Sequence, residues 1–239
     1  MDLFNEPEDY FQPDHDFFFT DFCDSSHSFQ LSHSFQLRAK SHPLYGHVVS
    51  NAARFLCTHL SSLPPLSSSI VVELGSGTGL VGIYASLLGT KHTFITDYPD
   101  QELLDNISFN CNSIIPTKPH SVVGFKWGQA VPPSIPKGKA DVVICADLVF
   151  NHHCHKDLAK SIKDLLAPSG CALFAFSHHR PLLVDEDLEF FNVCDQVGLR
   201  SSLVEVDSSF TPLFGEDMHH SLDVDGVVRG PVYFYKVYL

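Results

Sequence analysis

The stretch VVELGSGTGLVG, residues 71–82, decides the fold of this chain. Its first residues are an apolar run typical of a buried strand, and its last residues continue as an apolar helix to Gly89. Three alternate glycines, Gly75, Gly77 and Gly79, join the two elements. Glycine permits a sharp turn and lets a ligand approach the backbone closely. A plain strand-to-helix turn is the alternative, although three alternate glycines exceed what a turn requires.

On both sides of this stretch, apolar runs alternate with amphipathic segments. Helices are expected at about 43–60, 79–89, 99–111, 155–170 and 185–199, and strands at 69–74, 92–96, 121–127, 140–146, 171–177, 201–207 and 231–239. Such alternation implies a parallel sheet, but the last strand follows its predecessor without a clear helical pattern, which favours antiparallel insertion. The sequence therefore predicts an α/β fold, a Rossmann-like seven-stranded, mostly parallel sheet with an antiparallel last strand and helices on both faces.

Two cofactors compete for the glycine loop. The dinucleotide pattern G-x-G-x-x-G requires a glycine at position 80, where this chain has Leu80, so the strict pattern fails. Glu73 precedes the loop and completes E-L-G-x-G-x-G, which resembles the glycine motif of S-adenosylmethionine-dependent methyltransferases. That cofactor has no pyrophosphate to bind, but it has a ribose, an adenine and a charged amino-acid tail.

Residues at the ends of the next two strands suit a nucleoside. Asp97 follows Gly77 by 20 residues, where a carboxylate can accept hydrogen bonds from ribose hydroxyls. Dinucleotide enzymes share this feature, so it does not choose between the two cofactors. The alternative role for Asp97 is that of an acid at a helix N-terminus. Trp127, the only tryptophan, either belongs to the core or flanks a purine by stacking.

The stretch ADLVFNHHCHKD, residues 146–157, follows the fourth expected strand. Ligands bind at the carboxyl ends of strands in open α/β sheets, so Asp147, Phe150 and Asn151 are the candidate catalytic residues. An acid beside a methyl donor can hold or desolvate an incoming amine, and an aromatic side chain can form a wall of its site. The alternative is that Asp147 caps the following helix.

The histidines in this stretch suggest a metal site at first sight. Ligands on one helical face need spacings such as i and i+4, whereas His152, His153 and His155 point in different directions around a regular helix. We therefore expect no metal and a first helical turn of solvated histidines. The histidines of FSHHRP, residues 176–181, could reach the same rim, so a general-base role for one histidine stays open.

Composition limits the partners and the compartment. A formal net charge of −13 argues against a nucleic-acid surface and suits a locally basic protein partner. The seven cysteines are scattered without a C-x-x-C pair, which favours reduced thiols in a cytosolic or nuclear compartment. The start MDLFNEPEDYF lacks a signal-peptide layout, and no apolar run reaches the roughly 18 residues of a membrane span. A cytoplasmic protein without a membrane span is expected.

Residues 1–40 differ in composition from the rest, with acidic residues, serine, histidine and isolated phenylalanines. The hexapeptide SHSFQL occurs twice, at 26–31 and 32–37, which is too few copies for a solenoid. We expect an N-terminal arm that is partly disordered. The alternative is a strand or helix that folds over the active site.

Several stretches together resemble one family: LFNEPEDYF, HPLYGHVVSNAAR, VVELGSGTGL, TDYPDQELLDNISFN, DLVFNH and HHRP. They are similar to the seven-strand, or class I, protein methyltransferases related to the lysine methyltransferase 21 group. The resemblance covers nearly the whole chain apart from the repeat. It implies that residues 41–239 form a class I methyltransferase domain, which transfers methyl from S-adenosylmethionine to protein nitrogen. We expect the chain to be a monomer.

The resemblance also implies roles for residues. Gly75, Ser76 and Gly77 would hold the cofactor tail and Asp97 its ribose, while Trp127 and Ala146 would line its adenine and methyl-donor sides. Ser50 and Glu73 are assigned to cofactor binding as well. In a fungal branch of the family, the substrate is the N-terminal amine and an adjacent lysine of translation elongation factor 1-alpha.

The chain departs from the family pattern at three positions. Tyr45 and Ser50 replace the tryptophans of P-L-W-G-H and L-W-N, and Tyr235 replaces the tryptophan of R-x-x-V-x-x-W. Ser50 cannot stack as an indole does, which leaves room for a looser cofactor lid. Two alternatives to a protein methyltransferase follow: a small-molecule amine methyltransferase, and an inactive methyltransferase-like binding protein.

Overall fold

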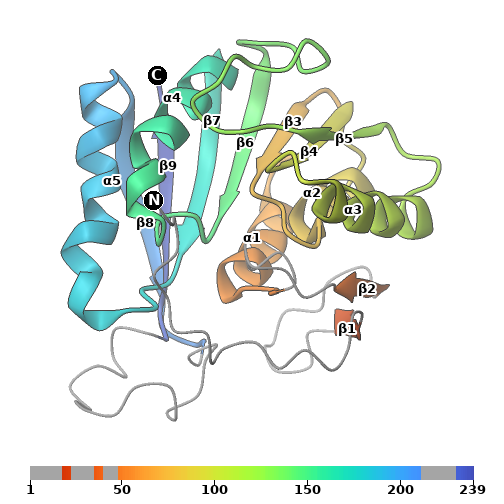
Figure 1. Cartoon of the computed structure of the whole chain (residues 1–239), viewed down its shortest axis with the longest axis horizontal. Coiled ribbons are helices and arrows are strands. Elements are labelled where there is room, and N and C mark those ends of the chain that lie inside the picture. The colour runs from red at the N-terminus through yellow and green to blue at the C-terminus, as the bar shows by residue number, and fades with distance from the viewer. Residues whose placement is uncertain (1–17, 23–34, 40–47, 211–229) are drawn as a thin grey trace.

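The computed structural model describes residues 18–22, 35–39, 48–210 and 230–239 of the chain (Figure 1). Its main sheet has seven strands in the order β5-β4-β3-β6-β7-β9-β8. They are β3 (Ile70–Leu74), β4 (His92–Asp97), β5 (His120–Gly124), β6 (Ala140–Ala146), β7 (Leu166–Phe176), β8 (Arg200–Asp207) and β9 (Val232–Tyr238). Neighbouring strands from β5 to β7 are parallel, and β9 lies antiparallel between β7 and β8. The expected seven-stranded sheet with an antiparallel last strand is confirmed.

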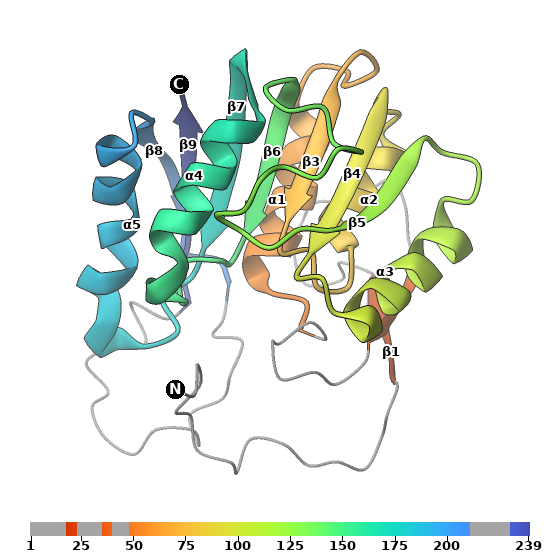
Figure 2. The same ribbon diagram turned by 45° about the horizontal axis from the view of Figure 1, so that its top comes forward.

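Helices cover both faces of this sheet, as the apolar runs predict. The helices are α1 (Asn51–Ser62), α2 (Leu80–Leu87), α3 (Gln101–Ile114), α4 (His155–Leu165) and α5 (Val184–Gln196). Alternate strand residues face opposite layers: Val71 and Val142 pack with α1, α2 and α3, whereas Val72 and Val143 pack with α4 and α5. Figure 2 shows α4 and α5 in front of the sheet and α1 and α2 behind it. None of the helices in the described ranges is long and apolar enough to cross a membrane.

The boundaries of several elements differ from the sequence-based expectation. The helix expected to reach residue 170 ends at Leu165, and residues 166–170 already belong to β7. Pro168 explains the difference, because proline lacks the N–H that a helix interior requires. The first helix begins only at Asn51, and the third strand ends at Gly124 rather than at Trp127.

A small antiparallel hairpin precedes the main sheet, with strands β1 (Phe18–Phe22) and β2 (Phe35–Ala39). Arg38 of β2 docks on α3: its backbone N–H donates to Asn110 Oδ1 at 2.8 Å and its Nε to Asn106 Oδ1 at 2.9 Å. Asn110 Nδ2 also donates to the carbonyl of Thr78 in the glycine loop at 2.9 Å. One buried amide therefore links β2 to that loop. The division of the chain at residue 40 stays a prediction.

Candidate active site

The glycine loop leaves β3 in a conformation that few residues other than glycine adopt. Gly75, Gly77 and Gly79 have φ values of 59°, 56° and 85°. The end of β4 fastens the loop, because Ser76 N–H donates to the Thr96 carbonyl at 3.0 Å. Gly77 N–H donates to Asp97 Oδ2 at 2.7 Å. The loop is therefore fastened at the carboxyl edge of the sheet, where ligands bind in such folds.

Asp97 is a buried carboxylate at the end of β4. Its Oδ2 accepts from Gly77, and its Oδ1 accepts the N–H of Tyr98 at 2.7 Å. Asp97 does not cap α3; that role belongs to Asp100, whose Oδ1 accepts from Glu102 N–H at 2.9 Å. The helix-cap alternative for Asp97 is thus wrong. A carboxylate at this place can accept hydrogen bonds from ribose hydroxyls, and a contact of Asp97 with the cofactor stays a prediction.

The segments after β3, β5 and β6 meet at Gly75. A Cβ atom added to Gly75 would lie 2.6 Å from Leu148 Cδ2 and 3.2 Å from Trp127 Cζ2. The structure thus places half-buried Trp127 beside the glycine loop, although its side chain also packs against the core under α4 and α5. Ala146, partly exposed, ends β6 just before Asp147 and Leu148. These residues share one edge of the sheet, and their contacts with a cofactor stay predictions.

Two other residues assigned to the cofactor have structural partners. The Glu73 side chain is buried beneath the loop, where its Oε2 accepts Gly82 N–H at 3.0 Å. Ser50 caps α1, because its Oγ accepts Ala53 N–H at 3.1 Å. Glu73 is therefore placed to support the loop from below, and Ser50 to fix the start of α1. A direct contact of either with a cofactor stays a prediction.

The loop carries a feature that fits S-adenosylmethionine. Ser76 Oγ is buried, yet it has no hydrogen-bond partner within the described part of the chain. Buried polar groups are otherwise satisfied in native proteins, so this hydroxyl suits a polar ligand atom. The charged tail of S-adenosylmethionine offers both a carboxylate and an ammonium group. Ser76, the glycine loop and the Asp97 carboxylate together form a donor and acceptor set that fits a nucleoside with such a tail.

Replacing Asp97 by Asn is expected to weaken S-adenosylmethionine binding by about 1.5–3 kcal/mol, roughly 10- to 150-fold. The amide keeps the shape of the side chain but loses the charge, and its NH2 group cannot accept one of the two backbone bonds from Gly77 and Tyr98. Isothermal calorimetry measures the affinity. Asp100→Asn is the matched control, since asparagine caps a helix as well as aspartate does. Unchanged affinity in folded Asp97→Asn would make Asp97 a purely structural residue.

Glu73 should make the stability of the protein depend on pH. Burial raises the pKa of Glu73 from 4.5 to about 8. Between these values the unfolded chain has lost the proton that the folded chain keeps, so the free energy of unfolding falls as pH rises from about 4.5 to about 8. Urea unfolding of Glu73→Gln, which mimics the protonated side chain, should show a weaker decline across this window. If the free energy of unfolding fell equally with pH in the wild-type protein and in Glu73→Gln, the raised pKa of Glu73 would be contradicted.

Asp147 has the only positive φ of any non-glycine residue in the described ranges, 62°. Its N–H donates to the Ala175 carbonyl at 2.7 Å, which ties the residue to the end of β7. Its Oδ2 contacts His179 Nε2 at 2.8 Å, and Ser177 N–H donates to its Oδ1 at 3.4 Å. The carboxylate does not cap the following helical turn, so the capping alternative is wrong. Such unusual backbone conformations cluster at functional sites.

The other two candidate catalytic residues lie directly after Asp147. The backbone carbonyl of Phe150 accepts a hydrogen bond from Arg180 Nη2 at 2.7 Å. Asn151 immediately precedes the short helix η2 (His152–Cys154) and is partly exposed. The structure thus brings Asp147, Phe150 and Asn151 into one turn that the segment after β7 holds. Their roles in catalysis stay predictions.

The expectation of solvated histidines is wrong for two of the three. His155 is 4% exposed and its Nε2 contacts the Val149 carbonyl at 2.7 Å. His152 Nε2 contacts Asp187 Oδ1 at 2.7 Å, while His153 is exposed. These side chains have separate partners, and no group of three possible metal ligands occurs in the part of the chain that is described.

Asp187 is not among the candidate residues predicted from the sequence. This buried carboxylate bridges His152 and His178, from the segments after β6 and β7. Its signal in the sequence is weak, since Asp185, Glu186 and Asp187 all read as acids in the first turn of a helix.

Comparison with known proteins identifies a family and close relatives. The family model described as lysine methyltransferase matches residues 32–197. A Candida glabrata protein named "Protein N-terminal and lysine N-methyltransferase EFM7" is 38% identical over 249 residues, which cover 98% of this chain and 94% of that protein. A Debaryomyces hansenii protein of the same name is 32% identical over 235 residues, with 93% and 91% covered.

Solved structures share the fold at low sequence identity. Pyrococcus horikoshii TYW2 in complex with MeSAdo has a TM-score of 0.59 and 11% identity, and the match covers 87% of this chain and 70% of that one. A SAM-dependent methyltransferase from Aquifex aeolicus has a TM-score of 0.55 and 13% identity, with 78% and 89% covered. At such identities the likeness concerns the fold alone.

Proposed function

The chain belongs to the lysine methyltransferase family and is an S-adenosylmethionine-dependent methyltransferase, and from this we propose that it methylates a protein at its N-terminal amine, at a nearby lysine, or at both. The family resemblance predicted from the sequence is confirmed. The proposed target follows the printed name of the relatives, which are described as acting on protein N-termini and lysines. The resemblance implies translation elongation factor 1-alpha as the candidate substrate.

The position of Asp147 is the observation that carries this proposal. The residue directly follows the central strand β6, and its neighbour Leu148 contacts the glycine loop. Its carboxylate is 13% exposed and held by His179 on one side. A partly exposed carboxylate next to the cofactor loop suits an amine that must be held while its nitrogen reacts.

Bound S-adenosylmethionine supplies an electrophilic methyl group to a nitrogen with a free lone pair. The residues of the chain then have to hold a neutral amine and exclude competing partners. An α-amine has a pKa near 7.8 and lysine near 10.4, so deprotonating lysine at neutral pH costs about 3.5 kcal/mol more. For an N-terminal amine, orientation by Asp147 and desolvation of the amine can therefore suffice for methyl transfer.

Charge and cysteine chemistry suit a basic partner in a reducing compartment. The formal net charge of −13 favours a lysine-rich segment over an acidic one. Within the described ranges the cysteines are free thiols: Cys57, Cys111, Cys145, Cys154, Cys171 and Cys194. These features support our proposal that the chain acts in the cytoplasm.

Transfer of labelled methyl into a lysate of cells that lack this chain tests the proposal. We expect the label on a protein of the size of the elongation factor, and its loss when the N-terminal amine and lysines are chemically blocked. Label confined to small molecules would replace the proposal with a small-molecule methyltransferase. Absence of any label would leave only the inactive binding protein.

A further inference from the structure

Three consecutive residues after β7 each contact a different part of the molecule. His178 Nδ1 contacts Asp187 Oδ2 at 2.8 Å, and His179 Nε2 contacts Asp147 Oδ2 at 2.8 Å. Arg180 Nη2 donates to the Phe150 carbonyl at 2.7 Å. The segment after β7 is thus joined both to the turn that carries Asp147 and to the start of α5.

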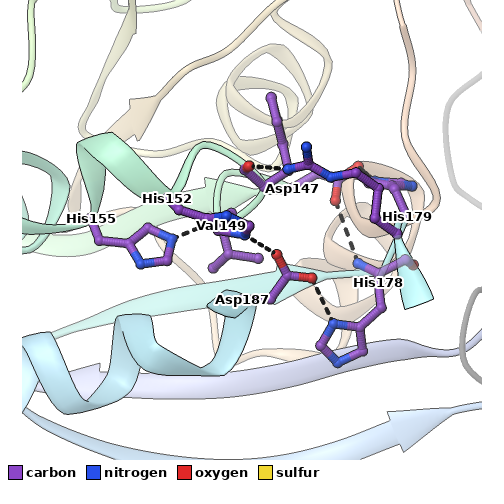
Figure 3. A network of polar contacts seen from close by, with 10 residues as sticks. Asp147, Val149, His152, His155, His178, His179 and Asp187 are labelled. Atoms are coloured by element: carbon purple, nitrogen blue, oxygen red, sulfur yellow. Dashed lines mark hydrogen bonds and ion pairs between the residues drawn. The ribbon is translucent and has the colours of Figure 1, made fainter. Parts of the chain in front are cut away.

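Asp187 is the buried centre of this arrangement, as Figure 3 shows. The residue is 3% exposed, and each of its oxygens contacts one imidazole, Oδ1 that of His152 and Oδ2 that of His178. His178 is 1% exposed and packs edge-on against Tyr233, with ring centroids 4.7 Å apart. A single carboxylate therefore links the segment after β6 to the segment after β7.

A role as a helix N-terminal acid does not account for the burial of Asp187. Asp185 and Glu186 occupy the same first turn and are exposed, so they already provide favourable charge at the helix start. Burying a carboxylate costs free energy unless hydrogen bonds compensate. Burial alone would raise the pKa of Asp187. The bonds with His178 and His152 instead hold this pKa below its ordinary value. The carboxylate is thus kept charged between two imidazoles.

We propose that Asp187 is a positioning residue of the methyl-transfer site, which acts through His178 to hold His179 against Asp147. The inference rests on the proposed function, because Asp147 is there the residue that holds the amine. His178 and His179 are adjacent in the chain, so fixing one imidazole restricts the backbone that carries the other. The same carboxylate also fixes His152, which lies just after the turn of Asp147, Phe150 and Asn151.

The arrangement predicts an electrostatic effect on His179. Burial opposes a charge on this imidazole, but Asp147 and then Asp187 raise its pKa above the ordinary value, while Arg180 acts in the opposite direction. The titratable and charged groups around the network are His152, His155 and Glu189 on the α4 and α5 side and Asp147, His178, His179 and Arg180 on the β6 and β7 side. Removing the charge of Asp187 should move the titration of His179 to lower pH.

Asp187→Asn tests the proposal in the full chain, with Asp185→Asn as the matched exposed control. We expect kcat to fall about ten-fold or more, since a bond to a charged group is lost, while the KM for S-adenosylmethionine is unchanged. The NMR titration of the His179 imidazole, assigned with a His179→Asn variant, should shift to lower pH. The control should change neither quantity.

A folded Asp187→Asn protein with wild-type kcat, or with an unmoved His179 titration, would overturn the proposal. If that variant does not fold, His178→Asn removes the bond through which Asp187 acts, and a wild-type kcat in this variant would overturn the proposal. The NMR titration needs no substrate. Failure of the wild-type chain to methylate any protein would therefore count against the proposed function alone. The link between Asp187 and His179 would still be tested by the titration.

Discussion

Gly77→Arg is expected to abolish S-adenosylmethionine binding. Gly77 has a φ of 56°, and its N–H donates to Asp97 Oδ2 at 2.7 Å. An arginine at this position is strained, because its backbone would have to adopt the left-handed conformation. Its side chain would also occupy the space in which the cofactor approaches the backbone of the loop. Isothermal calorimetry with the folded variant should show no heat of binding.

Gly89→Arg separates loss of the site from general backbone strain. Gly89 has a φ of 87° just after α2, and a Cβ atom there would meet nothing within 4 Å. This variant carries the same type of backbone strain away from the glycine loop, so it should lose stability but keep its cofactor affinity. Wild-type affinity in folded Gly77→Arg would remove the assignment of the loop to the cofactor.

Asp147→Asn is expected to lower kcat by about 10- to 150-fold and to leave cofactor affinity nearly unchanged. The loss corresponds to a charged hydrogen bond of about 1.5–3 kcal/mol that is made to the amine during transfer. Asparagine is the suitable replacement, because it tolerates the φ of 62° better than most residues do. Steady-state methylation of a peptide with a free, lysine-rich N-terminus measures the effect.

Asp164→Asn is the control for this variant. Asp164 pairs with Lys137 at 3.0 Å near the carboxyl end of α4, outside the turn that holds Asp147. It should retain full activity, and thermal melts should show that both variants are folded. Full activity in folded Asp147→Asn would contradict the role of this carboxylate.

Much of the fold follows from local patterns in the sequence. The runs around Val71–Leu74 and Ala140–Ala146 are apolar on both faces, which is typical of central parallel strands, and the structure buries both faces. Element ends were less predictable. The apolar spacing through Leu165 and Leu166 continues a helical pattern, and only the proline at 168 indicates that the chain must change direction.

The site is harder to predict, because its contacts are long-range. The spacing of Gly77 and Asp97 predicts an acid for the ribose, which stays a prediction. The hydrogen bond between these two residues arises because the adjacent parallel strands β3 and β4 end beside each other. Asp187 and His152 lie 35 residues apart, and nothing local distinguishes Asp187 from its two exposed acidic neighbours. His155 is expected in solvent as part of a first helical turn whose histidines point in different directions, whereas packing against Phe190 and the bond to Val149 bury it.

Mass spectrometry of the N-terminal peptide of elongation factor 1-alpha tests the central claim most directly. The factor is purified from cells that lack this chain and incubated with S-adenosylmethionine and either the wild-type chain or Asp147→Asn. We predict that the wild-type chain adds methyl groups to the N-terminal amine, to a nearby lysine, or to both, and that the variant adds far fewer. An N-terminal peptide whose mass the wild-type chain leaves unchanged would contradict this assignment of the substrate.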